Sequence, residues 1–180
     1  TNVSAGPNQE YFRAEIIARL GMRSTGYDVL GSPPGSRALG YRWQDEAWVR
    51  EPDMADGVFG AMGGVETTAD DYARWVAFLL SAWPARDDPE RGRVKRSTVR
   101  QIVEGANFPG TQTRPGPDGQ SCAAAFAYAK GWRVMDDCAL GRIVTHTGGY
   151  PGYGSVVALL PDSGIGIFAF SNRTYGAPVR

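Results

Sequence analysis

The stretch His146-Thr147-Gly148-Gly149-Tyr150-Pro151-Gly152-Tyr153-Gly154-Ser155 decides the fold of this chain. Strand-like residues precede it at Arg142–Thr147 and follow it at Ser155–Leu160, with glycine and proline between them. Two β-rich runs separated by turn-forming residues predict adjacent strands joined by a tight turn. The stretch therefore places one strand end and one turn of a sheet side by side in the sequence.

The sheet extends on both sides of this turn. Further strand-like segments are Phe126–Val134 and Ile165–Ser171, again bounded by turn residues, so the end of the chain is predicted to form an antiparallel meander. Ser155–Leu160 and Ile165–Ser171 are nearly continuous in apolar residues. Such runs are typical of strands buried on both faces, which requires helices above and below the sheet.

The first part of the chain shows helical spacing instead. Phe12, Ile16 and Leu20 recur at helical intervals within Gln9–Leu20. Thr68 precedes Asp71 in an N-capping arrangement, and a long apolar stripe follows it as far as Pro84. Ser97 is predicted to cap a shorter helix that runs to Glu104.

Two segments show no sustained helical or strand spacing of their apolar residues. Tyr27–Phe59 is predicted to be an irregular connection with a short strand-like stretch around Gly40–Val49, and Phe108–Gly119 a linker. We therefore expect residues 1–115 to form part of a helical lobe with irregular connections and residues 116–180 the C-terminal antiparallel strands. The predicted fold class is α/β (α+β), an antiparallel sheet flanked by helices.

Composition limits the partners. Lys plus Arg and Asp plus Glu number 19 each, so no net charge attracts nucleic acid, and we expect none as a partner. No apolar run approaches the length of a transmembrane helix, so we expect no membrane-spanning segment. The chain begins at Thr1 without a signal region, and we expect that its true start lies elsewhere.

The two cysteines, Cys122 and Cys138, leave two alternatives open. They form a disulfide if the protein is exported, or they are two partly buried thiols. His146 is the only histidine, so their spacing fits no zinc site, and we expect neither a metal nor a cofactor.

The motif His146-Thr147-Gly148 resembles the third active-site motif of serine β-lactamases and penicillin-binding proteins, which is Lys or His, then Thr or Ser, then Gly. Other strings resemble the same superfamily in the same order. They are Leu20-Gly21-Met22, Ser24-Thr25-Gly26, Gly63-Gly64-Val65-Glu66-Thr67-Thr68-Ala69-Asp70-Asp71, Leu160-Pro161-Asp162, Gly164-Ile165-Gly166-Ile167 and Ser171-Asn172-Arg173. The chain thus resembles the C-terminal portion of a class C β-lactamase or D-alanyl-D-alanine carboxypeptidase.

The resemblance implies roles for individual residues. The Gly149 N–H is expected to complete an oxyanion hole, with His146 beside the catalytic serine as a tuner of charge or a proton relay. Thr147 is expected to bind a substrate carboxylate, with Gly148 beside it on the same strand. Tyr150 and Tyr153 either line the pocket or belong to the core. Arg180 matches a carboxylate-binding position, whereas Ala177 offers no donor at another.

Two motifs of the superfamily do not occur in these 180 residues. No serine is followed three residues later by lysine, and no tyrosine two residues later by asparagine. We therefore expect a partial fold that lacks the N-terminal, nucleophile-bearing part. The isolated chain is predicted to be inactive and the parent a bacterial, periplasmic or secreted serine hydrolase. Its partners are then that missing part and a β-lactam, D-alanyl peptide or ester substrate.

Alternative interpretations remain beside these. The alternative to a hydrolase is a catalytically inert binding or structural module with the same fold. A lone histidine on a strand is more often structural than catalytic. Tyr72, Trp75 and Trp83 form a helical stripe that we interpret as packing rather than as a ligand platform.

Overall fold

The computed structural model describes residues 7–27, 33, 35–54, 57, 60–90, 94–104, 107–176 and 178. The chain divides into two units. The first comprises Thr1–Phe78, Gly149–Gly154 and Ser171–Gly176, and the second Leu79–Gly148, Ser155–Phe170 and Ala177–Arg180.

The predicted N-terminal helix forms, but it changes its winding. It begins as α1 (Asn8–Phe12) and continues as the π-helical segment η1 (Arg13–Ile17). The Ala18 N–H donates to the Arg13 carbonyl over 2.9 Å, the five-residue spacing of a π-helix. Gly21 follows with φ of +68°, a conformation that suits glycine at a helix end.

The irregular connection contains a β-hairpin that the sequence only hinted at. Strands β1 (Tyr41–Gln44) and β2 (Ala47–Arg50) pair antiparallel. The turn residues Asp45 and Glu46 have φ of 49° and 60°, the left-handed pair of a type I′ turn. This turn was missed because it lacks the Asn-Gly or Asp-Gly signature of such turns.

Helix α3 (Ala69–Leu80) follows the short α2 (Gly60–Gly63), and its predicted cap is confirmed. The Asp71 N–H donates to the Thr68 hydroxyl over 3.3 Å. The Asp71 carboxylate, which is buried, accepts the Ser24 N–H at 2.6 Å and the Thr25 hydroxyl at 2.9 Å. The start of α3 is thereby fixed to the segment that follows η1.

The aromatic residues of the α3 stripe are half-buried, as packing residues are. Trp75 lies against Phe78 with ring centroids 5.5 Å apart, and burial raises the pKa of Tyr72. Val76 and Leu79 of this helix are almost fully buried, at 5% and 1% exposure. The interpretation of the stripe as packing agrees with this burial.

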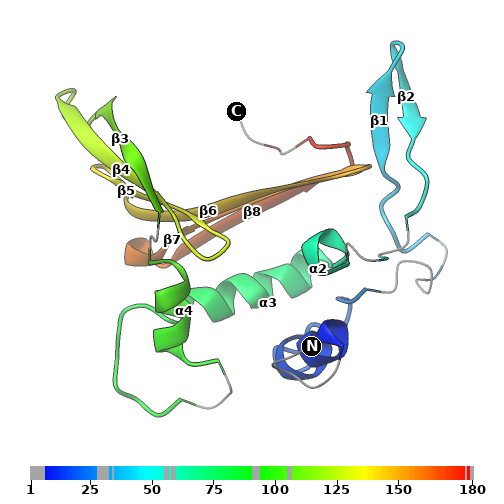
Figure 1. Ribbon diagram of the computed structural model, residues 1–180, viewed down its shortest axis with the longest axis horizontal. Coiled ribbons are helices and arrows are strands. Elements are labelled where there is room, and N and C mark those ends of the chain that lie inside the picture. The colour runs from blue at the N-terminus through cyan, green and yellow to red at the C-terminus, as the bar shows by residue number, and fades with distance from the viewer. Residues whose placement is uncertain are drawn as a thin grey trace. The chain divides into compact units, whose positions relative to one another are not determined.

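A six-stranded sheet with the order β3-β4-β5-β6-β7-β8 forms the rest of the fold (Figure 1). Because every strand lies beside its neighbour in sequence, the predicted meander is confirmed, and the fold is mixed α/β with antiparallel sheets. The strands are β3 (Asn107–Pro115), β4 (Ser121–Tyr128), β5 (Arg133–Asp137), β6 (Gly141–Tyr150), β7 (Tyr153–Leu160) and β8 (Ile165–Ser171), with η3 (Pro161–Ser163) before β8.

Three predictions about this region were wrong. Phe108–Gly119 is not a linker, because β3 covers most of it and pairs with β4 in the sheet. Its Pro, Gly and Thr content suits an exposed edge strand, which needs few apolar residues. Phe126–Val134 is not one strand, because a turn closed by the Ala129 N–H and the Trp132 carbonyl divides it. Ser97 is not a cap, since α4 (Arg96–Ile102) begins one residue before it.

The predicted burial of both faces holds for β7 but not for β8. No residue of β7 is exposed, and Leu159 is 1% exposed. In β8, Ile165 and Ile167 are 48% and 58% exposed. Ile165 and Ile167 are two positions apart and therefore lie on the same face of the strand, so this face of β8 is not covered there.

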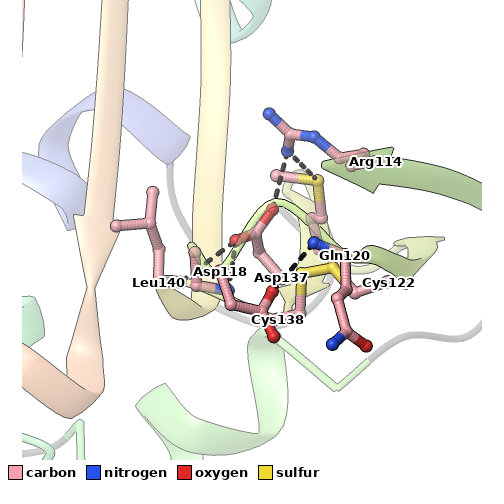
Figure 2. The surroundings of a disulfide bond; sticks show 9 residues. Arg114, Asp118, Gln120, Cys122, Asp137, Cys138 and Leu140 are labelled. Carbon is pink, nitrogen blue, oxygen red and sulfur yellow. Dashed lines mark hydrogen bonds and ion pairs between the residues drawn. A yellow bond between two sulfur atoms is a disulfide. The ribbon is translucent and has the colours of Figure 1, made fainter. Parts of the chain in front are cut away.

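A disulfide joins Cys122 of β4 to Cys138, directly after β5 (Figure 2). Beside it Asp137 is held from two sides. Its Oδ2 accepts from Arg114 at 2.7 Å, and its Oδ1 accepts the Ala139 and Leu140 N–H groups at 2.9 and 3.0 Å. The bond and these contacts together close the end of the β4–β5 pair.

We expect Asp137→Asn to lower the melting temperature near neutral pH. The backbone N–H groups of Ala139 and Leu140 hold the pKa of the Asp137 carboxyl below its ordinary value, and Arg114 adds to this. A carboxyl group whose folded pKa is lowered stabilises the fold above its unfolded pKa, and this contribution is lost as the pH falls through the folded value. Thermal unfolding followed by circular dichroism should show the full wild-type advantage at pH 7, its decline below the ordinary aspartate pKa of about 3.9, and its disappearance once the pH is below the lower folded pKa. An advantage that persists unchanged into acid would contradict this role.

Candidate functional site

The predicted motif lies at the C-terminal end of β6. It follows the last residue of β6 that pairs with the neighbouring antiparallel strand β5. The last paired residues are Arg133, where β5 begins, and Thr145. From His146 onward β6 continues to Tyr150 without a β5 partner. Thr147 and Gly149 are exposed in this portion, and His146 and Gly148 are half-buried. The motif is therefore not packed inside the protein.

His146 contacts a residue that the sequence analysis missed. Its Nε2 lies 3.3 Å from the hydroxyl of Tyr128, at the end of β4, and the two rings meet edge to face. Tyr128 is 41% exposed. No spacing rule connects the two residues, since β5 separates their strands in the sheet order. The histidine nevertheless has a definite hydrogen-bond partner.

Gly148 is a position where only glycine fits without movement. A Cβ built there would lie 2.3 Å from the Ser155 hydroxyl oxygen of β7. Real Cβ atoms essentially never come so close to another heavy atom, so a side chain would push the serine or the strand away. Gly148 therefore allows β6 and the Ser155 hydroxyl to lie in close contact beside Thr147.

Gly149 is covered on one side by an aromatic ring. A Cβ built on Gly149 would lie 2.3 Å from Cδ1 of Tyr175. The Tyr175 N–H points to the carbonyls of Tyr150, at 3.4 Å, and Tyr153, at 3.1 Å, which holds the residue beside the β6–β7 turn. Tyr175 has φ of 50° and is 67% exposed, and nothing in the sequence marked it as a site residue.

The two tyrosines of the turn are both half-buried, and each has a packing contact. The Tyr150 ring lies 3.4 Å from the place that a Cβ of Gly63 would take. The Tyr153 hydroxyl donates to the Ala38 carbonyl over 2.7 Å, and burial, as the largest cause, raises the pKa of Tyr153. This hydroxyl is already used to hold the 38–40 segment.

A polar chain fixes the turn after Gly149. The Gly152 N–H donates to the Thr174 hydroxyl over 2.8 Å, and that hydroxyl donates to Glu51 Oε1 over 2.7 Å. Gly152 has φ of +88° and approaches Gly40 so closely that a Cβ on it would lie 2.8 Å from the Gly40 Cα. Both glycines are required by this backbone contact.

Arg180 and Ala177 lie outside the described residues. Within the part of the chain that the structure describes, no group of three or more His, Cys, Asp or Glu residues could hold a metal ion. Among those same residues, no helix has the length and apolar character to cross a membrane.

The fold and the motif together define a mixed α/β protein whose motif strand carries His-Thr-Gly at an exposed end. The sequence profile of the Beta-lactamase family matches residues 2–180, and the chain belongs to that family. The resemblance to the serine β-lactamase and penicillin-binding protein superfamily is thereby confirmed.

The chain is similar to three proteins with different names. The chain is 24% identical over 176 residues to "Unguisins hydrolase ungD" of Aspergillus violaceofuscus (strain CBS 115571). The matched region covers 91% of the chain and 30% of that protein. An octameric penicillin-binding protein homologue from Pyrococcus abyssi has a TM-score of 0.71 at 19% identity, and the match covers 94% of the chain and 34% of the homologue. A D-stereospecific amidohydrolase from a Streptomyces species has a TM-score of 0.67 at 16% identity, and the match covers 96% of the chain and 46% of the amidohydrolase. The chain thus spans less than half the length of each of these three proteins.

Proposed function

We propose that the full-length protein is a serine acyl hydrolase that works through an acyl-enzyme, and that β6 supplies its oxyanion and substrate contacts. The observation that carries this proposal is the exposed end of β6 beyond Thr145, where the motif residues of the family lie at the surface. The Gly149 N–H then donates to the oxyanion of the tetrahedral intermediate. An exposed backbone donor without a side chain suits that task, because an acyl group can approach it closely.

The neighbouring residues take supporting roles in this proposal. Thr147, which is exposed, offers its hydroxyl to a carboxylate of the substrate. Gly148 keeps β6 close to Ser155. His146 lies near the reacting groups and offers a hydrogen bond there. Arg180 pairs with the same carboxylate. Tyr150 borders the site, whereas the hydroxyl bond of Tyr153 to Ala38 favours a structural role for Tyr153.

The substrate class follows from what this family hydrolyses. We propose an amide or ester acyl donor: a β-lactam, a D-amino-acid peptide or a related ester. The similar proteins named a D-stereospecific amidohydrolase and an unguisins hydrolase support cleavage of such acyl bonds beyond β-lactams. Histidine in place of lysine at the first motif position fits peptidases and esterases as well as β-lactamases.

The nucleophile is proposed to belong to another part of the full-length protein. Neither Ser-x-x-Lys nor Tyr-x-Asn occurs in the 180 residues. The chain by itself is therefore expected to be inactive, and its partner is the part of the same protein that carries the serine and lysine.

We also propose that the full-length protein works outside the cytoplasm, in the periplasm or as a secreted protein. The Cys122–Cys138 disulfide supports this location, because disulfides persist in oxidising compartments and are rare in the cytosol.

Covalent labelling tests the proposal directly. Full-length protein incubated with a fluorescent penicillin or a fluorophosphonate is expected to become covalently labelled, and this chain alone is expected to stay unlabelled. Replacement of the serine of Ser-x-x-Lys by alanine in the full-length protein is the matched control and should abolish labelling. Labelling of the isolated chain would refute the proposal. Unlabelled full-length protein without Ser-x-x-Lys would favour the inert binding module.

A further inference from the structure

We propose that Tyr128 is a positioning residue for His146, donating its hydroxyl proton to Nε2 so that the neutral imidazole carries its own proton on Nδ1. This inference rests on the proposed function for its catalytic meaning, because it specifies what His146 offers to the reacting groups. The contact itself is independent of that function. It joins two side chains of the second unit over 3.3 Å.

The place where β5 begins makes this contact possible. In the sheet order β5 lies between β4 and β6, and its first residue, Arg133, pairs with both Tyr128 and Thr145. His146 is the next residue of β6, so it lies just past the start of β5. The long Tyr128 side chain can reach the imidazole there, where no β5 residue pairs with His146.

The chemistry of the two groups decides the direction of the bond. A neutral imidazole has one nitrogen that donates and one that accepts. A phenol hydroxyl is the more acidic of the two groups and hence the better donor, and an unprotonated ring nitrogen is the better acceptor. Donation from Tyr128 to Nε2 therefore leaves the ring proton on Nδ1.

The assignment changes the role of His146. With its Nε2 lone pair engaged by Tyr128, the neutral ring has one other polar group, the Nδ1–H donor, and among the described residues this group has no hydrogen-bond partner. Such a ring stabilises negative charge by donating a hydrogen bond and does not accept a proton through Nδ1. Tyr128 acts through His146 and needs no contact with the substrate.

The chain offers an unusually clean test, because His146 is its only histidine. In ¹⁵N-labelled protein, long-range ¹H–¹⁵N correlation spectra report which ring nitrogen carries the proton. They should be recorded at alkaline pH, where an imidazole ring is neutral. We expect Nε2 to show the shift of an unprotonated nitrogen and Nδ1 that of a protonated one.

Tyr128→Phe removes only the hydroxyl oxygen. It is expected to move the tautomer ratio toward Nε2–H by about fivefold, the factor that corresponds to one neutral hydrogen bond of about 1 kcal/mol. Tyr153→Phe is the matched control, since it removes a hydroxyl that donates to the Ala38 carbonyl and should leave the ratio unchanged. The amide spectrum of each variant verifies that the chain is folded.

A protonated Nε2 in the unmodified chain would overturn the inference, and so would an unchanged ratio in Tyr128→Phe. Neither measurement requires a catalytic serine. Failure of the labelling experiment would therefore leave the tautomer result standing, and an unexpected tautomer would leave the acyl-hydrolase proposal standing.

Discussion

Replacing Gly149 with alanine is expected to slow acyl-enzyme formation by the full-length protein about 100-fold, the effect of losing one oxyanion-hole donor. The added Cβ would lie 2.3 Å from Cδ1 of Tyr175, a distance that neither group can tolerate. The backbone of Tyr175 is held by the bonds from its N–H to the carbonyls of Tyr150 and Tyr153, so the residue as a whole stays beside Gly149. We therefore expect β6 to shift at Gly149, which moves the N–H away from the oxyanion. The rate of labelling by a fluorescent penicillin at low probe concentration measures the effect.

The double variant Gly149→Ala/Tyr175→Ala separates this steric cause from other effects. Removal of the ring takes away the atoms that the new Cβ would meet, so labelling should recover most of the lost rate. Tyr175→Ala alone gives the baseline for the comparison. A double variant as slow as Gly149→Ala would show that the ring contact is not the cause. Unchanged labelling in the single Gly149→Ala variant would contradict the prediction that the added Cβ displaces the Gly149 N–H from the oxyanion.

Local signals in the sequence were reliable where they specified a complete element. The Thr68 cap and the periodic stripe after it predicted α3, because capping and helical spacing act within a few residues. The apolar runs on either side of the glycine-rich stretch predicted β6 and β7 for the same reason. These local patterns were therefore sufficient to assign His146–Gly149 to the end of a strand.

Contacts between distant segments could not be predicted in this way. Strand β3 was mistaken for a linker because its residues form a strand only by pairing with β4. The Tyr128 contact with His146 depends on where β5 begins, and the cover of Gly149 by Tyr175 depends on the path of the chain after β8. These arrangements follow from register and turn geometry, which one sequence does not specify.

Removal of the disulfide is expected to lower the free energy of unfolding by about 3 kcal/mol, the value for a closed loop of about 15 residues. Cys122 and Cys138 are 16 positions apart, with their Cα atoms at 6.2 Å. The link restricts the unfolded chain, which loses less conformational entropy on folding than an open chain does. Urea unfolding of the oxidised chain and of Cys122→Ala/Cys138→Ala measures the difference.

The double variant also supplies the control for the mechanism. Because it contains no thiol, its urea midpoint should not respond to a reductant, whereas that of the unmodified chain should fall toward it. The Asp137 contacts with Ala139 and Leu140 are made by neighbouring residues and should survive reduction. The acid-dependent part of the stability is therefore expected to remain in the reduced chain. An unmodified chain whose midpoint ignores the reductant would show that the disulfide does not stabilise the fold.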